Sequence, residues 1–220
     1  MVTDWRPVWL TLQVSFTATF FSVALGLVLA WVLARRQFYG RHLLDAVLMQ
    51  PMVIPPTVLG YYLLVAFGRG SALGSLLENW LGLTLVFTWR GAVLAAMVAS
   101  LPLFIKPARA AFESVDRELE NAARLLGKSD WAVFRTITLP LAWRGVLAGG
   151  VMAFARAVGD FGTTLMVAGN IPGKTQTLSI AIYDAVQSGE QGRANALVLL
   201  VTVFSVAVMW FVSRITAGRY

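Results

Sequence analysis

The sequence has 220 residues, of which 58% are hydrophobic and only 13% are charged, and its mean hydropathy is +0.70. Soluble domains carry about twice that share of charged residues, so this composition indicates an integral membrane protein. The chain has no cysteine and one histidine, which excludes disulfides, thiol catalysis and a zinc cluster. The net charge of +7 fits either nucleic-acid binding or cytoplasmic loops, and the positions of the basic residues decide between them.

The apolar segments predict an all-α, polytopic fold with one membrane domain over residues 1–220. A spanning helix needs about 20 mostly apolar residues. The expected spans are 8–34, 46–68, 86–106, 145–168 and 194–213. Pro51, Pro55 and Pro56 are expected to kink or delay the second span. The stretch 69–83 is expected to be a loop with a short surface helix, and the more polar stretch 171–193 is expected to be a loop.

The basic residues predict the side of the membrane that each loop faces. Five spans put the two chain ends on opposite sides. With the N-terminus outside and the C-terminus in the cytoplasm, the inner loops hold twelve of the 18 basic residues: Arg35, Arg36, Arg41, Lys106, Arg109, Arg117, Arg124, Lys128, Arg135, Arg144, Arg214 and Arg219. Because basic residues concentrate in cytoplasmic loops, we expect this orientation and no nucleic-acid partner.

The stretch 116–140 is highly charged between long apolar segments, and the expected orientation places it in the cytoplasm. It is expected to form two short amphipathic helices broken at Gly127, with Ser129 as the N-cap of the second helix and Pro140 as its end. The first helix has an apolar stripe at helical spacing, made of Leu119, Ala122, Ala123 and Leu126. Small residues and mixed charge favour docking into a protein groove over burial in the lipid surface.

Arg156 and Asp160 are four residues apart in the expected fourth span, so they are expected to lie on one helix face and form an ion pair. Charges inside a membrane are costly, and such a pair is either a structural clamp or part of an anion pathway. An anion gains little from a fully neutralised arginine, which favours the clamp.

The string AGNIPGKT, at 168–175, matches a relaxed phosphate-binding loop. A true loop of this kind follows a buried strand and opens a helix in a compartment that holds ATP. This string follows a membrane segment, contains Pro172 and is expected outside. We therefore expect no cofactor in this chain, and its energy source must be another protein.

The cytoplasmic stretch resembles the "EAA" loop of permease subunits of binding-protein-dependent ABC importers. The spacing of that loop is fully kept by Asn121, Ala122, Ala123, Gly127, Ile137, Leu139 and Pro140. Asn121 stands where the family carries glutamate, with Glu120 beside it, and the docking helix itself is kept. The resemblance implies that these residues couple the permease to an ATPase.

Two further stretches, 50–74 and 155–183, resemble the molybdate-importer permeases, with Asp160 where those relatives usually carry glutamate. The resemblance implies a type I importer permease in the bacterial inner membrane that moves molybdate by alternating access and is not itself an enzyme. Its implied partners are a second copy of itself, two cytoplasmic subunits that bind ATP with magnesium, an external molybdate-binding protein and the lipid bilayer. Polar groups expected along the anion pathway are Thr57, Thr163, Thr164 and Asn170.

Three alternatives remain open from the sequence. The same kind of permease could carry sulfate, thiosulfate or tungstate. An ion-coupled secondary transporter would usually need more spans and a buried carboxylate that is free to titrate. A membrane-embedded enzyme would need clustered histidines and carboxylates at a membrane face, which this sequence lacks.

Overall fold

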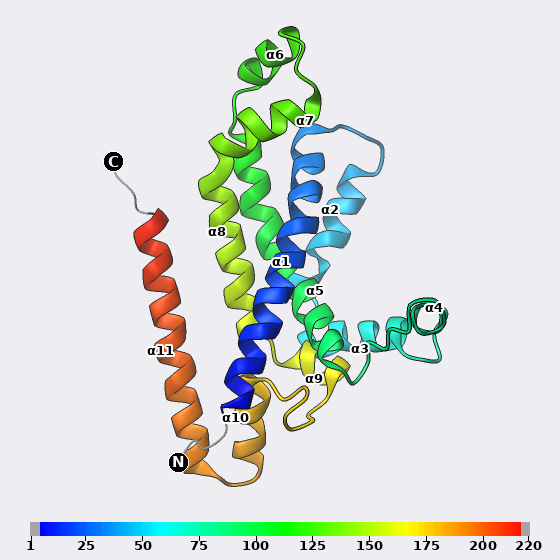
Figure 1. Ribbon diagram of the computed structural model, residues 1–220, viewed down its shortest axis with the longest axis vertical. Coiled ribbons are helices and arrows are strands. Elements are labelled where there is room, and N and C mark those ends of the chain that lie inside the picture. Colours follow the sequence, from blue (N-terminus) through cyan, green and yellow to red (C-terminus); the bar gives the residue numbers. More distant parts are fainter. Residues whose placement is uncertain (1–4, 217–220) are drawn as a thin grey trace.

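The computed structural model describes residues 5–216, and Figure 1 shows long helices that run side by side. Arg219, counted above among the inner basic residues, lies outside the described residues. In chain order the elements are α1 (Arg6–Arg35), α2 (Arg41–Met49), η1 (Gln50–Met52), α3 (Pro56–Phe67), α4 (Ala72–Leu81), α5 (Trp89–Glu113), α6 (Arg117–Leu125), α7 (Asp130–Val133), η2 (Phe134–Thr138), α8 (Leu139–Val158), α9 (Gly162–Ala168), α10 (Leu178–Gln187) and α11 (Gln191–Thr216).

Four helical runs in the described part of the chain are long and apolar enough to cross a membrane: α1, α5, the run from α7 through α8, and α11. The pair formed by α2–η1 and α3 gives a fifth candidate, but the chain bends by 114° between its halves. Three prolines lie at this break, at positions 51, 55 and 56, and each lacks the backbone N–H that a continuous helix needs. The stretch expected as the second span is therefore a bent pair of helices.

Helix α5 is the centre of the bundle, with α1 and α8 packed against it. Both helices approach α5 closely at Phe104, which is fully buried. A Cβ atom at Gly26 of α1 would lie 2.3 Å from the Phe104 ring, and one at Gly149 of α8 would lie 2.8 Å from the Phe104 carbonyl oxygen. Glycine at both positions lets the two helices approach α5 closely, as small residues do between membrane helices.

The stretch 145–168, expected as one span, is divided in the structure. Helix α8 ends at Val158, the chain turns at Gly159, and the short helix α9 begins at Gly162. Asp160 therefore lies in the break between two helices, which exposes the N-terminal N–H groups of α9 to its side chain.

The expectation of a loop over 171–193 is wrong in its centre, because α10 occupies Leu178–Gln187. Leu178 and Ala181 face inward and pack with Leu197 of α11. This spacing of inward-facing residues is that of a helix. The polar residues on both sides of α10 make the whole stretch 171–193 polar on average, which is why it was expected to be a loop.

The expectation that Pro140 ends the second helix of the cytoplasmic stretch is also wrong. The helix continues from α7 into α8 through η2, a π-helical segment in which the Leu139 N–H bonds to the Phe134 carbonyl. Proline lacks an N–H and crowds the turn before it, so a wider turn at this point accommodates Pro140 without breaking the helix. Figure 1 places α6 and α7 at one end of the bundle and the start of α1 at the other.

Candidate functional site

Helix α6 is defined by local signals at both ends. Asp116 accepts a hydrogen bond from the Glu118 N–H at 2.8 Å, and Gly127 follows the helix with a φ of +82°. The predicted break at Gly127 is confirmed, because only a residue that tolerates the left-handed region ends a helix in this way at low cost. The predicted N-cap at Ser129 is confirmed too, since its hydroxyl accepts from the Ala132 N–H at 3.3 Å.

The predicted apolar stripe of α6 does not form one buried face. Ala123 is buried, whereas Ala122 is exposed, and the exposed fractions of Leu125 and Leu126 are 89% and 84%. Leu119 is also exposed. We call the surface formed by Leu119, Ala122, Leu125 and Leu126 the outer face of α6. Leucines this exposed at the tip of a projecting helix are typical of a surface that binds another protein.

The structure separates the residues of the predicted coupling motif into two groups. Asn121, Ala122 and Gly127 lie on or beside the exposed helix α6. Ile137, Leu139 and Pro140 lie in the run from η2 into α8, and Leu139 packs against the main core. The motif therefore spans both a surface helix and the root of a long bundle helix.

Glu120, which the sequence prediction left without a role, is the most buried polar residue of α6. Its side chain is 3% exposed and forms an ion pair with Arg35 at 3.0 Å. It accepts a hydrogen bond from the Thr138 hydroxyl at 2.5 Å. Arg35 also donates to the Val115 carbonyl at 3.0 Å. Glu120 precedes the buried Ala123 by three residues, so the two side chains share one helix face, but no pattern in the sequence marked that face as the inward one.

A second set of charges joins the two short helices at the surface. Asp130 accepts hydrogen bonds from Arg36 at 2.8 Å and from Arg124 at 2.9 Å. Arg124 donates as well to the Asn121 side-chain oxygen at 2.9 Å. Asn121 is exposed, so the position that carries glutamate in the resembled family faces outward and contacts a residue of its own helix.

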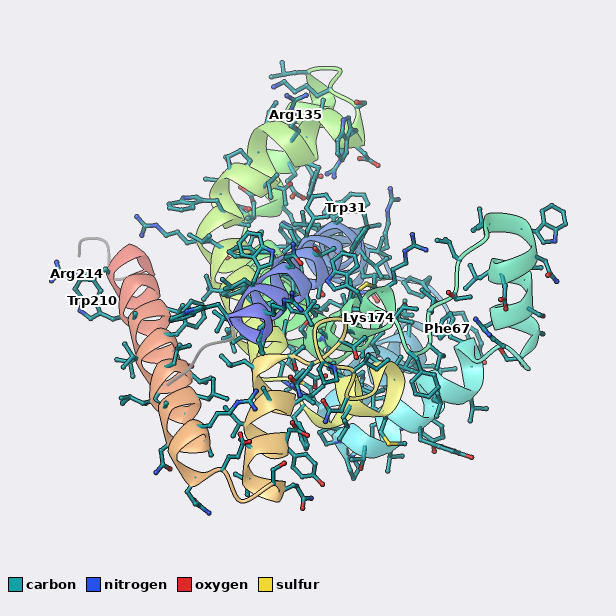
Figure 2. All side chains as sticks on the ribbon, turned by 60° about the horizontal axis from the view of Figure 1, so that its bottom comes forward. Trp31, Phe67, Arg135, Lys174, Trp210 and Arg214 are labelled. Carbon is teal, nitrogen blue, oxygen red and sulfur yellow. The ribbon has the colours of Figure 1, made fainter. Side chains whose placement is uncertain are left out.

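Aromatic side chains fasten α7 and η2 to the bundle. Trp131 stacks on Phe134 with ring centroids 5.6 Å apart, and Phe134 contacts Trp31 of α1 and Phe112 of α5 at 5.9 and 5.8 Å. Figure 2 shows Trp31 on α1 near the segment that carries Arg135. An apolar groove of about 500 Å³ lies between α1 and α7 beside these rings.

The predicted pair of Arg156 and Asp160 forms, with a nitrogen–oxygen distance of 2.9 Å. Asp160 is almost fully buried and also binds the first turn of α9, where it accepts from the Thr163 hydroxyl, the Thr164 hydroxyl and the Thr164 N–H at 3.1, 2.7 and 3.0 Å. A carboxylate at a helix N-terminus is stabilised by the free N–H groups there. These contacts connect α8 to α9 and fit a clamp.

Of the four polar residues expected along a pathway, Thr57 lies beside the start of α9, which carries Thr163 and Thr164, and Asn170 follows the end of that helix. Thr163 and Thr164 are buried against Asp160, and Thr57 is exposed on α3. Asn170 donates to Asp184 of α10 at 2.9 Å and accepts from Gln176 at 2.9 Å.

The string at 168–175 forms a closed turn after α9. The Thr175 hydroxyl donates to the Gly169 carbonyl and accepts from the Ile171 N–H, both at 3.1 Å. The Ile171 N–H is thus occupied within the turn, and the turn follows a helix instead of a strand.

Comparison with known proteins gives a consistent set of similarities. Residues 22–218 match the family described as "Binding-protein-dependent transport system inner membrane component". The chain is 46% identical to the molybdenum transport system permease protein ModB of Escherichia coli strain K12, over 98% of this chain and 97% of that protein. It is 34% identical to a probable sulfate transport system permease protein of Chlorella vulgaris, over 91% of this chain and 76% of that protein.

Among solved structures, the MetNI methionine ABC transporter in inward-facing conformations is similar in fold. The TM-score is 0.71 at 20% identity, and the match covers 97% of this chain and 94% of that one.

Proposed function

Because this chain belongs to the family of binding-protein-dependent transport system inner membrane components, we propose that it forms the membrane pathway of an ATP-driven importer for molybdate. The chain is a multi-pass, non-catalytic permease subunit of the inner membrane. The assignment of molybdate as the transported anion rests on the similarity, over almost the whole chain, to a molybdenum permease. The sulfate permease is less similar, which supports molybdate over sulfate.

The proposed partners are a second copy of this chain, two cytoplasmic subunits that bind ATP with magnesium, and an external molybdate-binding protein. The outer face of α6 supports a docking role, because it projects from the bundle and exposes apolar side chains. An ATPase groove that receives this helix would bury Leu125 and Leu126. ATP binding would then draw the two ATPase subunits together, move both α6 helices, and open the pathway outward; hydrolysis would reset it.

Alternating access places a limit on what the permease itself must recognise. The external protein selects the anion, so the pathway has to pass it and need not hold it tightly. This fits the structure, in which Arg156 is neutralised by Asp160 and is not available as a strong anion site.

The test is uptake of radioactive molybdate into vesicles whose membrane contains the purified complex. ATP is supplied on the side of the membrane where the ATPase subunits lie, and the binding protein is supplied on the opposite side. Tungstate and sulfate are measured in the same vesicles. We expect ATP-dependent uptake of molybdate that excess tungstate inhibits and excess sulfate does not. Vesicles with a non-hydrolysable ATP analogue provide the matched control. Uptake of sulfate at a rate equal to or above that of molybdate would refute the assignment of molybdate as the transported anion.

A further inference from the structure

We propose that Glu120 is a positioning residue that makes α6 move together with the bundle helices, through its buried contacts with Arg35 and Thr138. This inference rests on the proposed function, since it concerns how work received by α6 reaches the membrane pathway. It assigns a role to a residue beside the position that carries the family's glutamate.

The contacts of α6 with the rest of the chain are few, and Glu120 makes the most directional ones. Only Glu120 and Ala123 are buried among the nine residues of the helix. The surface pairs of Asp130 with Arg36 and Arg124 have side chains that are 38–58% exposed. Exposed ion pairs contribute little because water screens them, whereas a buried pair resists displacement since separating it leaves an uncompensated charge.

The groups around Glu120 belong to the ends of all three central helices. Arg35 is the last residue of α1, and Val115, whose carbonyl Arg35 binds, follows the end of α5. Thr138 is the last residue of η2 and directly precedes α8. The Glu120 carboxylate therefore connects α6 directly with the end of α1 and the start of α8, and its partner Arg35 extends the connection to the segment that follows α5.

This arrangement converts a displacement of α6 into a displacement of the bundle. If α6 moved alone, the Glu120 carboxylate would lose the Arg35 guanidinium and the Thr138 hydroxyl inside a protein environment and would keep only the longer pair with Arg124 of its own helix, at 3.9 Å. Moving the helix ends along with α6 avoids that cost. A purely structural role would predict instead that loss of the charge lowers stability without changing the amount of anion moved for each ATP hydrolysed.

The experiment compares Glu120→Gln with the wild-type complex of permease, ATPase and binding protein in liposomes, and measures molybdate uptake and ATP hydrolysis together. Glutamine keeps the size of the side chain and can still accept from Thr138, but it removes the charge that Arg35 faces. We expect the complex to hydrolyse ATP while the ratio of molybdate moved to ATP hydrolysed falls roughly tenfold, a typical coupling effect.

The matched control is Glu113→Gln, at the end of α5. Glu113 pairs with Arg109 and Arg41 at 2.8 and 3.6 Å, and neither partner belongs to α6, so we expect an unchanged ratio. The double variant Arg35→Gln with Glu120→Gln should have a ratio no lower than the single Glu120→Gln variant, because both residues act through one contact.

The outcomes separate this inference from the proposed function. Absence of molybdate uptake by the wild-type complex would refute the proposed function. Normal wild-type uptake with an unchanged ratio in Glu120→Gln, or an equal fall in Glu113→Gln, would refute the role of Glu120. If the Glu120→Gln complex does not assemble, Thr138→Val decides: it keeps the ion pair, and we expect a fall of about threefold from the loss of one hydrogen bond. A wild-type ratio in Thr138→Val would then overturn the inference.

Discussion

Ala122 and Ala123 are adjacent in the sequence but point in directions about 100° apart on α6, one outward and one inward, so the same substitution at each should fail in a different way. Ala122 is exposed, and Ala123 is buried, at 5% exposure, one turn from Glu120. Aspartate at 122 changes mainly helix propensity, which costs the permease about 0.5 kcal/mol. Aspartate at 123 buries a carboxylate that competes with Glu120 for Arg35, at a cost of at least about 3 kcal/mol.

The docking of the ATPase should respond in the opposite order. A charge in the centre of an apolar interface typically costs about 2 kcal/mol or more, which is roughly thirtyfold in affinity. We therefore expect Ala122→Asp to give a stable permease that binds the ATPase subunits weakly. Ala123→Asp should give a permease of low yield and a lower midpoint of thermal unfolding. Neither variant should support molybdate uptake at the wild-type rate.

Two measurements distinguish these failures. Thermal unfolding of the purified permease, followed by tryptophan fluorescence, reports its stability without the ATPase. Co-purification and titration with the ATPase subunits report docking. Wild-type ATPase affinity in Ala122→Asp would show that the outer face of α6 is not the docking surface. A wild-type unfolding midpoint in Ala123→Asp would show that residue 123 does not face inward.

Three further predictions follow from local geometry. Gly127→Val should reduce molybdate uptake strongly, whereas Gly127→Asn should keep most of it. Nothing lies within 4 Å of a Cβ at this position, so only the positive φ selects against valine, and equal uptake by both variants would contradict this. Asp160→Asn should lower the amount of assembled permease, since Arg156 and the α9 N-terminus lose their charge partner at a cost of about 3 kcal/mol; full assembly with altered anion selectivity in uptake assays would favour the pathway role instead. Gly26→Ala should lower the thermal unfolding midpoint, because the added methyl group overlaps Phe104 at a cost of about 1–3 kcal/mol. Gly150→Ala is the control, since a Cβ there has its nearest neighbour at 3.8 Å, and similar midpoints for the two variants would refute the close packing at Gly26.

Local signals made much of this fold predictable. Apolar length indicated the long helices, and Gly127 and Ser129 marked the end of α6 and the start of α7, because each of these features depends on a residue and its immediate neighbours. The continuation past Pro140 was not predictable, since it depends on a wider turn that the preceding residues adopt in context. Helix α10 was missed because it is only ten residues long and polar residues flank it on both sides, and its packing partner on α11 lies beyond the segment.

In the candidate site, too, features that depend on neighbouring residues were predictable, and features that depend on another helix were not. The exposed position of Asn121 and the break at Gly127 follow from helix geometry, but the burial of Glu120 depends on Arg35, which belongs to a different helix. Arg35 and Arg36 predicted only a cytoplasmic loop, because charge counting does not distinguish an arginine that faces water from one that faces a carboxylate. The structure shows that Arg35 is 7% exposed and Arg36 58% exposed, so two adjacent arginines have different environments.

This difference bears on the departure at Asn121. Residues 120 and 121 point in directions about 100° apart on a helix, so a carboxylate at one cannot replace a carboxylate at the other. Glu120 is held inside by Arg35 and Thr138, and Asn121 is exposed beside Arg124. Glu120 therefore cannot supply the negative charge that a glutamate at position 121 would present at the surface of this chain. In the proposed docking, the outward contact of α6 would rely on the apolar side chains of the outer face and on the neutral amide of Asn121, while the buried carboxylate would keep the helix connected to the bundle.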